Sequence, residues 1–403
     1  MKKETYWCGV DWATRSHAVC VVDGSGGVRA RFEVPNTGKT FAGLIKRLVK
    51  LEVAGVGIER PDGPLVEALM EAGLRVFVVA PRMLKAVRAR YGAAGAKSDP
   101  GDAFVLGDLL RTDHHRLAPL VPDGGATKGL RALTRTRRDL VDARIALSNQ
   151  LLAQLERCFP GAVGLFHRLH SSVALAFLRR YPTAARAARL TEAGLAAFLR
   201  RIHYSGRKPV KELLARIREA PPAVLDREED AARATCVLAL LDAIEACQGR
   251  AREIEAEVVE RLELHADAPV FTSLPRAGRG VRAASLLAEI GDARERFPDP
   301  ESLTALAGAA PVTRASGKHR AVTFRWACDK KLRQAVMDFA DDSRHASPWA
   351  ADIYRRAIER GCRHPHAVRI LARAWLRVIW RCWQDRSPYD VTKHRGAVML
   401  VAA

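Results

Sequence analysis

The N-terminal part of the chain alternates short apolar runs with polar, turn-forming segments. We predict three strands within residues 5–35, where the segment ATRSH separates the first two and DGSGG joins the second pair. The elements expected next are helices near 39–51 and 63–72, strands at 55–59 and 75–80, and a helix within 97–111. Three strands followed by alternating helices and strands predict an α/β domain with a mixed sheet.

From about residue 126 to residue 265 the apolar positions recur at helical spacing. Leucines repeat every seven residues at positions 133, 140 and 147. The second half carries one apolar stripe, formed by Leu241, Ile244, Cys247, Ala251, Ile254, Val258 and Leu262. Because Arg137 and Arg144 interrupt the first stripe, the pattern favours a helical hairpin or a short coiled coil over a long zipper.

A third region begins at the segment SLPRAGRG and is expected to form a compact helical domain. The fold class we predict is therefore α/β plus all-α. The expected domains are residues 1–118, a helical or coiled-coil domain at 126–265, a C-terminal domain at 266–390, and a tail at 391–403 to which we assign no role.

Charge separates the candidate function classes. Lys and Arg outnumber Asp and Glu by 66 to 45, which gives the chain a formal net charge of +21. Such an excess on a chain with 48% hydrophobic residues indicates a folded protein that binds a polyanion, most simply nucleic acid. The alternative is an arginine-rich composition without a functional meaning.

The cysteines and the hydropathy indicate where the protein resides. Eight cysteines are scattered singly without a C-x-x-C pair, so we expect reduced, mostly packed thiols, and the histidines form no zinc motif. No apolar stretch approaches the ~18 residues of a membrane span, and the start MKKET leads into a strand instead of a signal sequence. We expect a cytoplasmic, nucleoid-associated bacterial protein without a membrane partner.

Four acids stand where elements begin or end. Asp11 ends the first predicted strand, Glu59 ends the strand GVGIE, and Asp99 and Asp102 lie three apart at the start of a helix. The helix acids also fit a simpler role, with Asp99 as the N-cap before Pro100 and Asp102 as a capping-box acid. A carboxylate at the end of a buried strand, by contrast, needs a partner.

Bringing four carboxylates together is unfavourable without cations. Two like charges at ~4 Å repel by about 4 kcal/mol at an effective dielectric constant near 20. A pair of magnesium ions removes this repulsion, and their separation of ~3.5–4 Å suits phosphodiester chemistry. The order of strand acid, second-strand acid and two helix acids resembles the RNase H-like, RuvC-type nuclease core. In that resemblance Asp11 serves to hold metal.

A competing resemblance is to sugar kinases and actin-like ATPases, which also begin with the pattern G-V-D-x-(G)-T. Here Trp12 and Ala13 replace the glycine that lets the backbone approach phosphate. No second hairpin of this kind follows, and the C-terminal half lacks a second α/β lobe.

The C-terminal region holds two further candidates. Residues 272–297 are predicted to form a glycine turn followed by a short helix whose backbone amides can meet phosphate, although an ordinary helix–helix turn fits equally well. Ser316 stands in a small-residue loop beside Gly317 and Lys318, among Arg314, His319 and Arg320. Such a serine is either a nucleophile or a phosphate contact.

Taken together, the motifs resemble the insertion-sequence-110 family of transposases, which are bridge-RNA-guided DEDD and serine recombinases. The resemblance covers about residues 5–390. It includes the four acids, RPDG after Glu59, KSDPGDA, YPT at 181–183, LPRAGRG…LLAEIGD…RF and LAGAAPVTRASGKHR. The chain departs from the family where Arg276 and Ala277 separate Pro275 from Gly278, and where the serine loop is ASGKH instead of the commoner SSGK.

The resemblance implies an N-terminal RuvC-like domain, a coiled-coil middle and a C-terminal transposase domain. It implies that Asp11, Glu59, Asp99 and Asp102 hold Mg²⁺, two ions per site, and that Ser316 attacks a DNA phosphodiester. It further implies donor and target DNA, a structured noncoding guide RNA, and a homo-oligomer, dimer or tetramer, whose active sites are shared between subunits.

A basic helix is predicted at residues 364–386. Its arginines recur at four-residue steps opposite an apolar side that contains Leu371, Trp375, Ile379 and Trp383. The stripe is either a solvated face or a phosphate-binding surface. The candidate nucleic-acid contacts are Lys318, Arg320, Lys330, Lys331, Arg369, Arg373, Arg377 and Arg381.

The sequence thus predicts a metal-dependent DNA recombinase that moves its own insertion sequence. One alternative is a RuvC-like structure-specific nuclease in which Ser316 only contacts phosphate. The other is a non-catalytic, basic nucleic-acid-binding protein whose acids are helix caps.

Overall fold

The computed structural model describes residues 4–92, 98–316 and 319–393, and these form two compact units. One unit comprises the chain up to Gly124 together with Ala293–Pro298. The other comprises Gly125–Asp292 and the chain from Asp299 onward. Over the described residues, no helix combines the length and apolar character that crossing a membrane requires.

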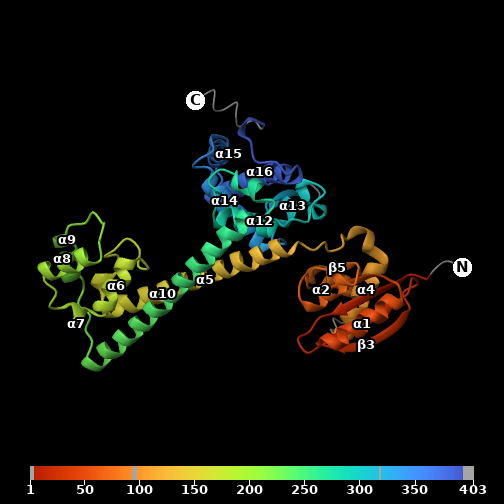
Figure 1. Cartoon of the computed structure of the whole chain (residues 1–403), viewed down its shortest axis with the longest axis horizontal. Helices are drawn as coiled ribbons and strands as arrows, with labels where there is room; N and C mark the ends of the chain where they lie inside the picture. The colour runs from red at the N-terminus through yellow and green to blue at the C-terminus, as the bar shows by residue number, and fades with distance from the viewer. Residues whose placement is uncertain (1–3, 93–97, 317–318, 394–403) are drawn as a thin grey trace. The chain divides into compact units, whose positions relative to one another are not determined.

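The first unit is built on a five-stranded sheet with the order β3-β2-β1-β4-β5 (Figure 1). Strands β1 and β2 are antiparallel, as are β2 and β3, whereas β1, β4 and β5 are parallel, so the predicted mixed sheet is confirmed. The elements are β1 (Tyr6–Asp11), β2 (Ser16–Val22), β3 (Val28–Pro35), α1 (Gly38–Lys50), β4 (Val53–Ile58), α2 (Pro64–Glu71), β5 (Val76–Val78), α3 (Pro81–Arg88), α4 (Asp99–Asp113) and the short η1 (His114–Arg116).

Helices cover both faces of this sheet, and as a result β1 and β2 are buried on both sides. On one face, Cys8 and Val10 pack in a core with Phe41 and Leu44 of α1 and with α2. On the other, alternate residues such as Trp7 pack with α4. The run of consecutive apolar residues in β1 therefore marks a central strand.

The second unit contains two long helices, α5 (Gly125–Cys158) and α10 (Arg227–Glu263), which pack as an antiparallel hairpin. The direction follows from the paired residues: Arg137 contacts Glu255 near one end, and Arg157 contacts Glu229 near the other. The predicted helical hairpin is confirmed. The predicted stripe on α10 is only partly buried, because Leu241, Ile244, Ala251, Val258 and Leu262 are buried whereas Cys247 and Ile254 are not.

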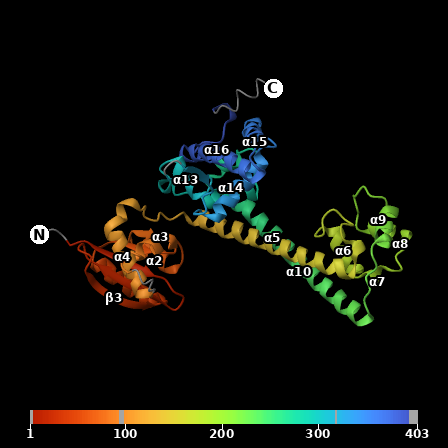
Figure 2. The ribbon, with the colours of Figure 1, turned by 180° about the vertical axis from the view of Figure 1, so that it is seen from behind.

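A small helical subdomain links the outer ends of the two long helices, in yellow-green in Figure 2. Its core joins Leu151 and Leu155 of α5 to Val237 and Leu241 of α10. Its elements are η2 (Pro160–Ala162), α6 (Ser172–Arg180), α7 (Ala184–Ala187), α8 (Glu192–Arg201) and α9 (Val210–Glu219).

The C-terminal region is mainly helical, as predicted, but it also contains a β-hairpin. Its elements are α11 (Ala268–Thr272), α12 (Val281–Ile290), η3 (Arg294–Arg296), α13 (Pro300–Leu306), β6 (Val312–Ser316), β7 (His319–Thr323), α14 (Lys330–Ser343), α15 (Pro348–Glu359), α16 (His364–Gln384) and η4 (Val391–Lys393). The expectation that Ser316 lies in a loop is wrong, because Ser316 is the last residue of β6 and pairs with His319.

None of the eight cysteines forms a disulfide bond, as expected.

Candidate active site

Two of the predicted acids lie side by side at one edge of the sheet. Val10 and Ile58 are partners in the parallel β1–β4 register. Asp11 is the last residue of β1, and Glu59 is the residue that follows β4 and not, as predicted, the last one of the strand. Both are partly exposed. The residues that follow also meet, because the guanidinium of Arg60 lies over the Trp12 ring at 4.3 Å from its centroid. This cation–π contact ties the two strand ends together.

Helix α4 brings the other two acids to the same end of the sheet. His114, the residue that follows α4, lies near the start of β1, where its ring stacks on Trp7 at 4.4 Å between ring centroids. Its first half lies against Gly9, where an added Cβ would be 2.0 Å from the Ala103 carbonyl oxygen. The helix therefore runs antiparallel to β1, and its first turn points toward the end that carries Asp11.

The simple capping role predicted for these two acids is wrong. Ser98 is the N-cap, with extended backbone angles, and its hydroxyl accepts a hydrogen bond from the Gly101 N–H at 3.2 Å. Asp99 is already the first helical residue and is exposed. Gly101 occupies the third helical position, so Asp102 is not a capping-box acid.

The Asp102 carboxylate is instead held by an arginine. It is buried, and Arg88 at the end of α3 donates two hydrogen bonds to it, from Nε to Oδ1 and from Nη2 to Oδ2, both at 2.6 Å. A bidentate guanidinium pair of this kind supplies the positive charge that a buried carboxylate requires. Sequence reasoning missed Arg88, since nothing in its spacing links it to Asp102.

The chemistry of these side chains fits a hard divalent cation. Carboxylate oxygens are the ligands that Mg²⁺ prefers, and Asp11 and Glu59 present two of them at adjacent strand ends. Among the residues that the structure describes, no three Asp, Glu, His or Cys side chains lie close enough together to hold one ion. A shared site for all four acids stays a prediction.

Ser316 is exposed at the end of β6 and belongs to the second compact unit, whereas the four acids belong to the first. Its predicted neighbour Lys318 lies outside the described residues, as does the side chain of Arg320.

Close to the hairpin lies an aromatic and basic cluster that the sequence did not reveal. The guanidinium of Arg369 lies 4.3 Å and that of Arg333 lies 5.3 Å from the centroid of the Phe324 ring. Burial lowers the pKa of Arg369, and the positive charge of the nearby Arg333 lowers it further. Trp326 packs edge-on against Phe324 and remains 71% exposed. Exposed indoles and guanidinium planes are groups on which unstacked bases stack.

The predicted arginine stripe on α16 is only partly available for other partners. The apolar side is confirmed as buried: Leu371, Trp375, Ile379 and Trp383 all have no exposed surface. On the basic side, Arg377 pairs with Glu301 at 2.8 Å and Arg381 pairs with Asp385 at 2.7 Å. Arg373 and Arg369 are half-buried.

Of the two lysines at the start of α14, Lys330 is exposed and Lys331 pairs with Asp139 of α5 at 2.9 Å. The nucleic-acid contacts assigned to these lysines and to the arginine stripe stay predictions.

The glycine turn before α12 is held by an acid of the chain itself. Arg276 has a φ of +61° and Gly278 a φ of +59°. The Nε of Arg276 donates a hydrogen bond to the Asp342 carboxylate of α14 at 3.0 Å, and Arg282 forms an ion pair with the same carboxylate at 2.7 Å. The hydrogen bond from Arg276, together with the charge of Arg282, lowers the pKa of Asp342. These contacts of Asp342 hold the turn and the first residues of α12 in one arrangement.

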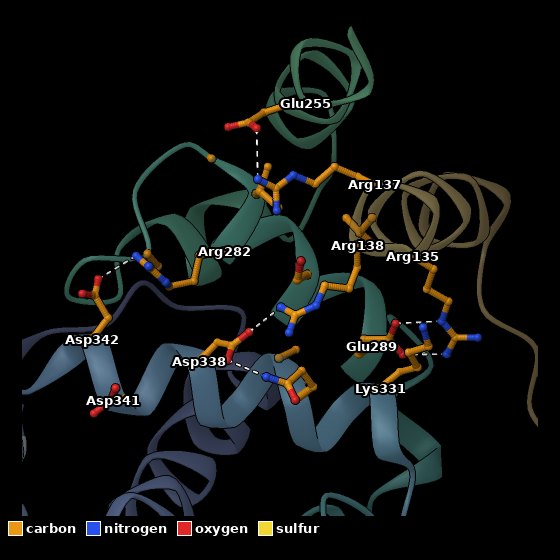
Figure 3. Close-up of a pocket in the computed structure, with 17 residues that line it drawn as sticks. Arg135, Arg137, Arg138, Glu255, Arg282, Glu289, Lys331, Asp338, Asp341 and Asp342 are labelled. Carbon is orange, nitrogen blue, oxygen red and sulfur yellow. Dashed lines mark hydrogen bonds and ion pairs between the residues drawn. The ribbon is translucent and has the colours of Figure 1, made fainter. Parts of the chain in front are cut away.

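This turn borders a cavity of about 610 Å³ between α5, α10, α12 and α14 (Figure 3). Its charged side chains form internal pairs: Arg135 with Glu289 at 2.6 Å, Arg137 with Glu255 at 3.2 Å, Arg138 with Asp338 at 2.9 Å, and Arg282 with Asp342. Because the lining holds five basic and five acidic residues, it presents no net charge to a ligand. Its ion pairs tie the long helices to the C-terminal region.

Comparisons with known proteins agree with this architecture. Residues 8–160 match a transposase model of the DEDD type from the IS110 family, and residues 268–355 match the model described as transposase, IS116/IS110/IS902 family. A mini-circle putative transposase for IS117 from Streptomyces coelicolor is 34% identical, over 99% of each chain. A 42 kDa protein of insertion element IS900 from Mycobacterium paratuberculosis is 28% identical, over 95% of this chain and 96% of the relative.

A relative with more than 30% identity along the whole chain, together with matches to both family models, settles the assignment. The chain belongs to the IS110 family of insertion-sequence transposases.

Proposed function

We propose that this transposase cuts and joins DNA through metal-dependent chemistry at the sheet edge and a covalent link to Ser316. The observation that carries the proposal is the register of β1 and β4, which puts Asp11 and Glu59 at adjacent strand ends with the first turn of α4 directed to the same end. The strand order β3-β2-β1-β4-β5 supports an RNase H-like, RuvC-type assignment for this unit.

In this proposal Asp11, Glu59, Asp99 and Asp102 would hold Mg²⁺, two ions per site. When bound, the ions would neutralise the phosphate and lower the pKa of a coordinated hydroxyl. Asp102 would first have to exchange the Arg88 guanidinium for a cation. Asp99 is exposed at the first turn of α4, and among the described residues it has no arginine partner of this kind.

The serine reaction balances as a transesterification. The Ser316 Oγ forms a bond to phosphorus and gives its proton to a base, while the bond from phosphorus to the 3′ oxygen breaks and that oxygen takes up a proton. The products are a phosphoserine link and a free 3′ hydroxyl. Because an unactivated hydroxyl is a weak nucleophile, serine and carboxylates are required together.

We further propose that donor and target DNA are selected by a structured guide RNA encoded beside the gene. The family resemblance implies this, and the chain shows no zinc finger or basic-zipper pattern. The same resemblance implies that carboxylates and serine meet across subunits of a homo-oligomer, a dimer or tetramer.

The experiment that tests the chemistry is recombination on a plasmid carrying the element ends, with the products analysed under denaturing conditions. Wild-type protein with Mg²⁺ should leave DNA covalently attached to protein, and Ser316→Ala should abolish this attachment while binding survives. Asp11→Asn should lose cleavage and keep binding. Mg²⁺-dependent cleavage without a protein-linked product would favour a structure-specific nuclease in which Ser316 only contacts phosphate.

RNA guidance is tested separately. Protein purified without RNA should recombine its specific site only after the flanking transcript is added. Site-specific recombination by RNase-treated protein alone would refute the guide.

A further inference from the structure

Residues 159–224 form a subdomain that neither family model covers beyond residue 160. The subdomain shares a core with the ends of α5 and α10, in which Phe159, Phe166, Phe177 and Phe198 are all buried. Its helices α6, α7 and α8 each begin at a Ser or Thr whose hydroxyl accepts a backbone hydrogen bond. These caps and this core give the segment a defined surface.

That surface is strongly basic. Residues 159–224 contain twelve Arg and Lys and three Glu, a net charge of +9 out of the +21 of the whole chain. About one sixth of the residues thus carries more than two fifths of the charge, so a uniformly arginine-rich composition does not explain it. All twelve side chains are exposed: Arg168, Arg179, Arg180, Arg186, Arg189, Arg200, Arg201, Arg207, Lys208, Lys211, Arg216 and Arg218.

Few of these charges are neutralised within the protein. Arg179 pairs with Asp242 and Glu245 of α10, and Lys208 lies 3.7 Å from Glu212. Within the described part of the chain, the other ten basic side chains have no ion pair to a carboxylate. The cavity at the other end of the hairpin is lined by equal numbers of acidic and basic residues. On the surface of residues 159–224 the basic residues are in large excess over the acidic ones.

The densest part lies where α8 ends and α9 begins. Arg200, Arg201, Arg207, Lys208 and Lys211 fall within twelve residues of chain, all exposed. Along α9, Lys211 and Arg218 lie two helical turns apart, about 10 Å, on one side of the helix. A row of this length can contact successive phosphates of one backbone.

The position of the aromatic rings indicates which form of nucleic acid fits. The four phenylalanines are buried, and Tyr181 and Tyr204 are partly covered, so within residues 159–224 the exposed aromatic rings are the imidazoles of His167 and His203. A surface with twelve exposed cations and no exposed Trp, Tyr or Phe ring among its described residues suits the phosphate-lined outside of a double helix.

We propose that residues 159–224 bind the phosphate backbone of double-helical nucleic acid without reading its sequence. This contact would be separate from the cleavage site, and it requires neither metal nor Ser316. It would hold a duplex segment on the protein while other residues carry out selection and cleavage.

The test compares two full-length triple variants that remove equal charge. One is Arg200→Gln, Arg207→Gln and Lys211→Gln in the subdomain. The matched control is Lys39→Gln, Lys46→Gln and Lys50→Gln on α1, whose side chains are also exposed. Binding to fluorescent duplex DNA, duplex RNA and single-stranded DNA of random sequence is measured over a salt series in EDTA, so that the result does not depend on catalysis.

The subdomain variant should lose duplex affinity, and its slope of log affinity against log salt should flatten by about 2–3, or ~0.9 per lost contact. The control should change much less, and a charge-keeping variant, Arg200→Lys with Arg207→Lys, should bind like wild type. The DNA and RNA duplexes identify which helix is held. An unchanged salt slope, an equal loss in the control, or a loss confined to single strands would overturn the proposal.

Discussion

Gly9 sets how closely α4 approaches β1, so Gly9→Ala is a direct probe of the sheet edge. An alanine Cβ at this position would lie 2.0 Å from the Ala103 carbonyl oxygen and 2.5 Å from the Gly107 nitrogen. Both are backbone atoms, which no rotamer change can move. Since ordinary contact begins at about 3.4 Å, the helix must move away by roughly 1.4 Å or β1 must bend.

Overpacking of this kind costs about 1–3 kcal/mol, and we expect the upper end because the clash is with backbone. The same displacement would carry Asp99 and Asp102 away from Asp11, so strand cleavage should fall more than DNA binding. The matched control is Gly43→Ala in α1, an exposed helical glycine with nothing within 4 Å of the added Cβ. That change should stabilise the unit by about 0.5–1 kcal/mol.

Hydrogen exchange in peptides that cover β1 and α4 measures the effect in this unit alone. Protection should fall in Gly9→Ala and rise slightly for α1 in Gly43→Ala. Wild-type protection in both β1 and α4 of the Gly9 variant would show that the helix does not pack as described.

Three further outcomes are expected. Arg88→Ala leaves the buried Asp102 unpaired and should destabilise the first unit by about 2–3 kcal/mol in urea unfolding, with Arg88→Lys in between; no change would contradict the pair. Burial lowers the pKa of His17 in the folded protein, so the unfolded state binds a proton more readily than the folded state does. The unfolding free energy should therefore fall as pH drops below about 6.5, and in His17→Gln the part of this pH dependence that comes from His17 should be missing. Replacing Arg373 and Arg377 by Gln should weaken binding to all DNA sequences alike and flatten the salt slope by roughly one, because the Arg377 charge is already paired with Glu301; altered target choice would instead mean base contacts.

The apolar runs in the sequence predicted the central strands of the first unit well, because a strand buried on both sides is apolar along most of its length. The side-by-side placement of Asp11 and Glu59 follows from parallel strands, whose carboxyl ends meet at one edge. The buried side of α16 was equally predictable from its four-residue spacing.

Other features depend on contacts that local patterns do not carry. The Arg88–Asp102 pair joins two helices across residues 89–101, and no spacing rule marks it. Ser98 and Asp99 are both good capping residues, so the sequence alone did not decide between them. The β6–β7 hairpin was missed since its strands hold Ala, Ser, Arg and His as well as β-branched residues.

Because the linked ends of α5 and α10 lie close together, the subdomain of residues 159–224 is an exchangeable module. The chain leaves α5 and enters α10 at neighbouring points, because Arg157 lies 3.8 Å from Glu229 and Arg233 donates a hydrogen bond to Gln154 at 2.8 Å. A short turn could join the two helices there, provided that the uncovered apolar side chains Leu151, Leu155, Val237, Leu241 and Ile244 were made polar. A different domain can thus be grafted at this point while the first compact unit and the β6–β7 hairpin keep their own sequences.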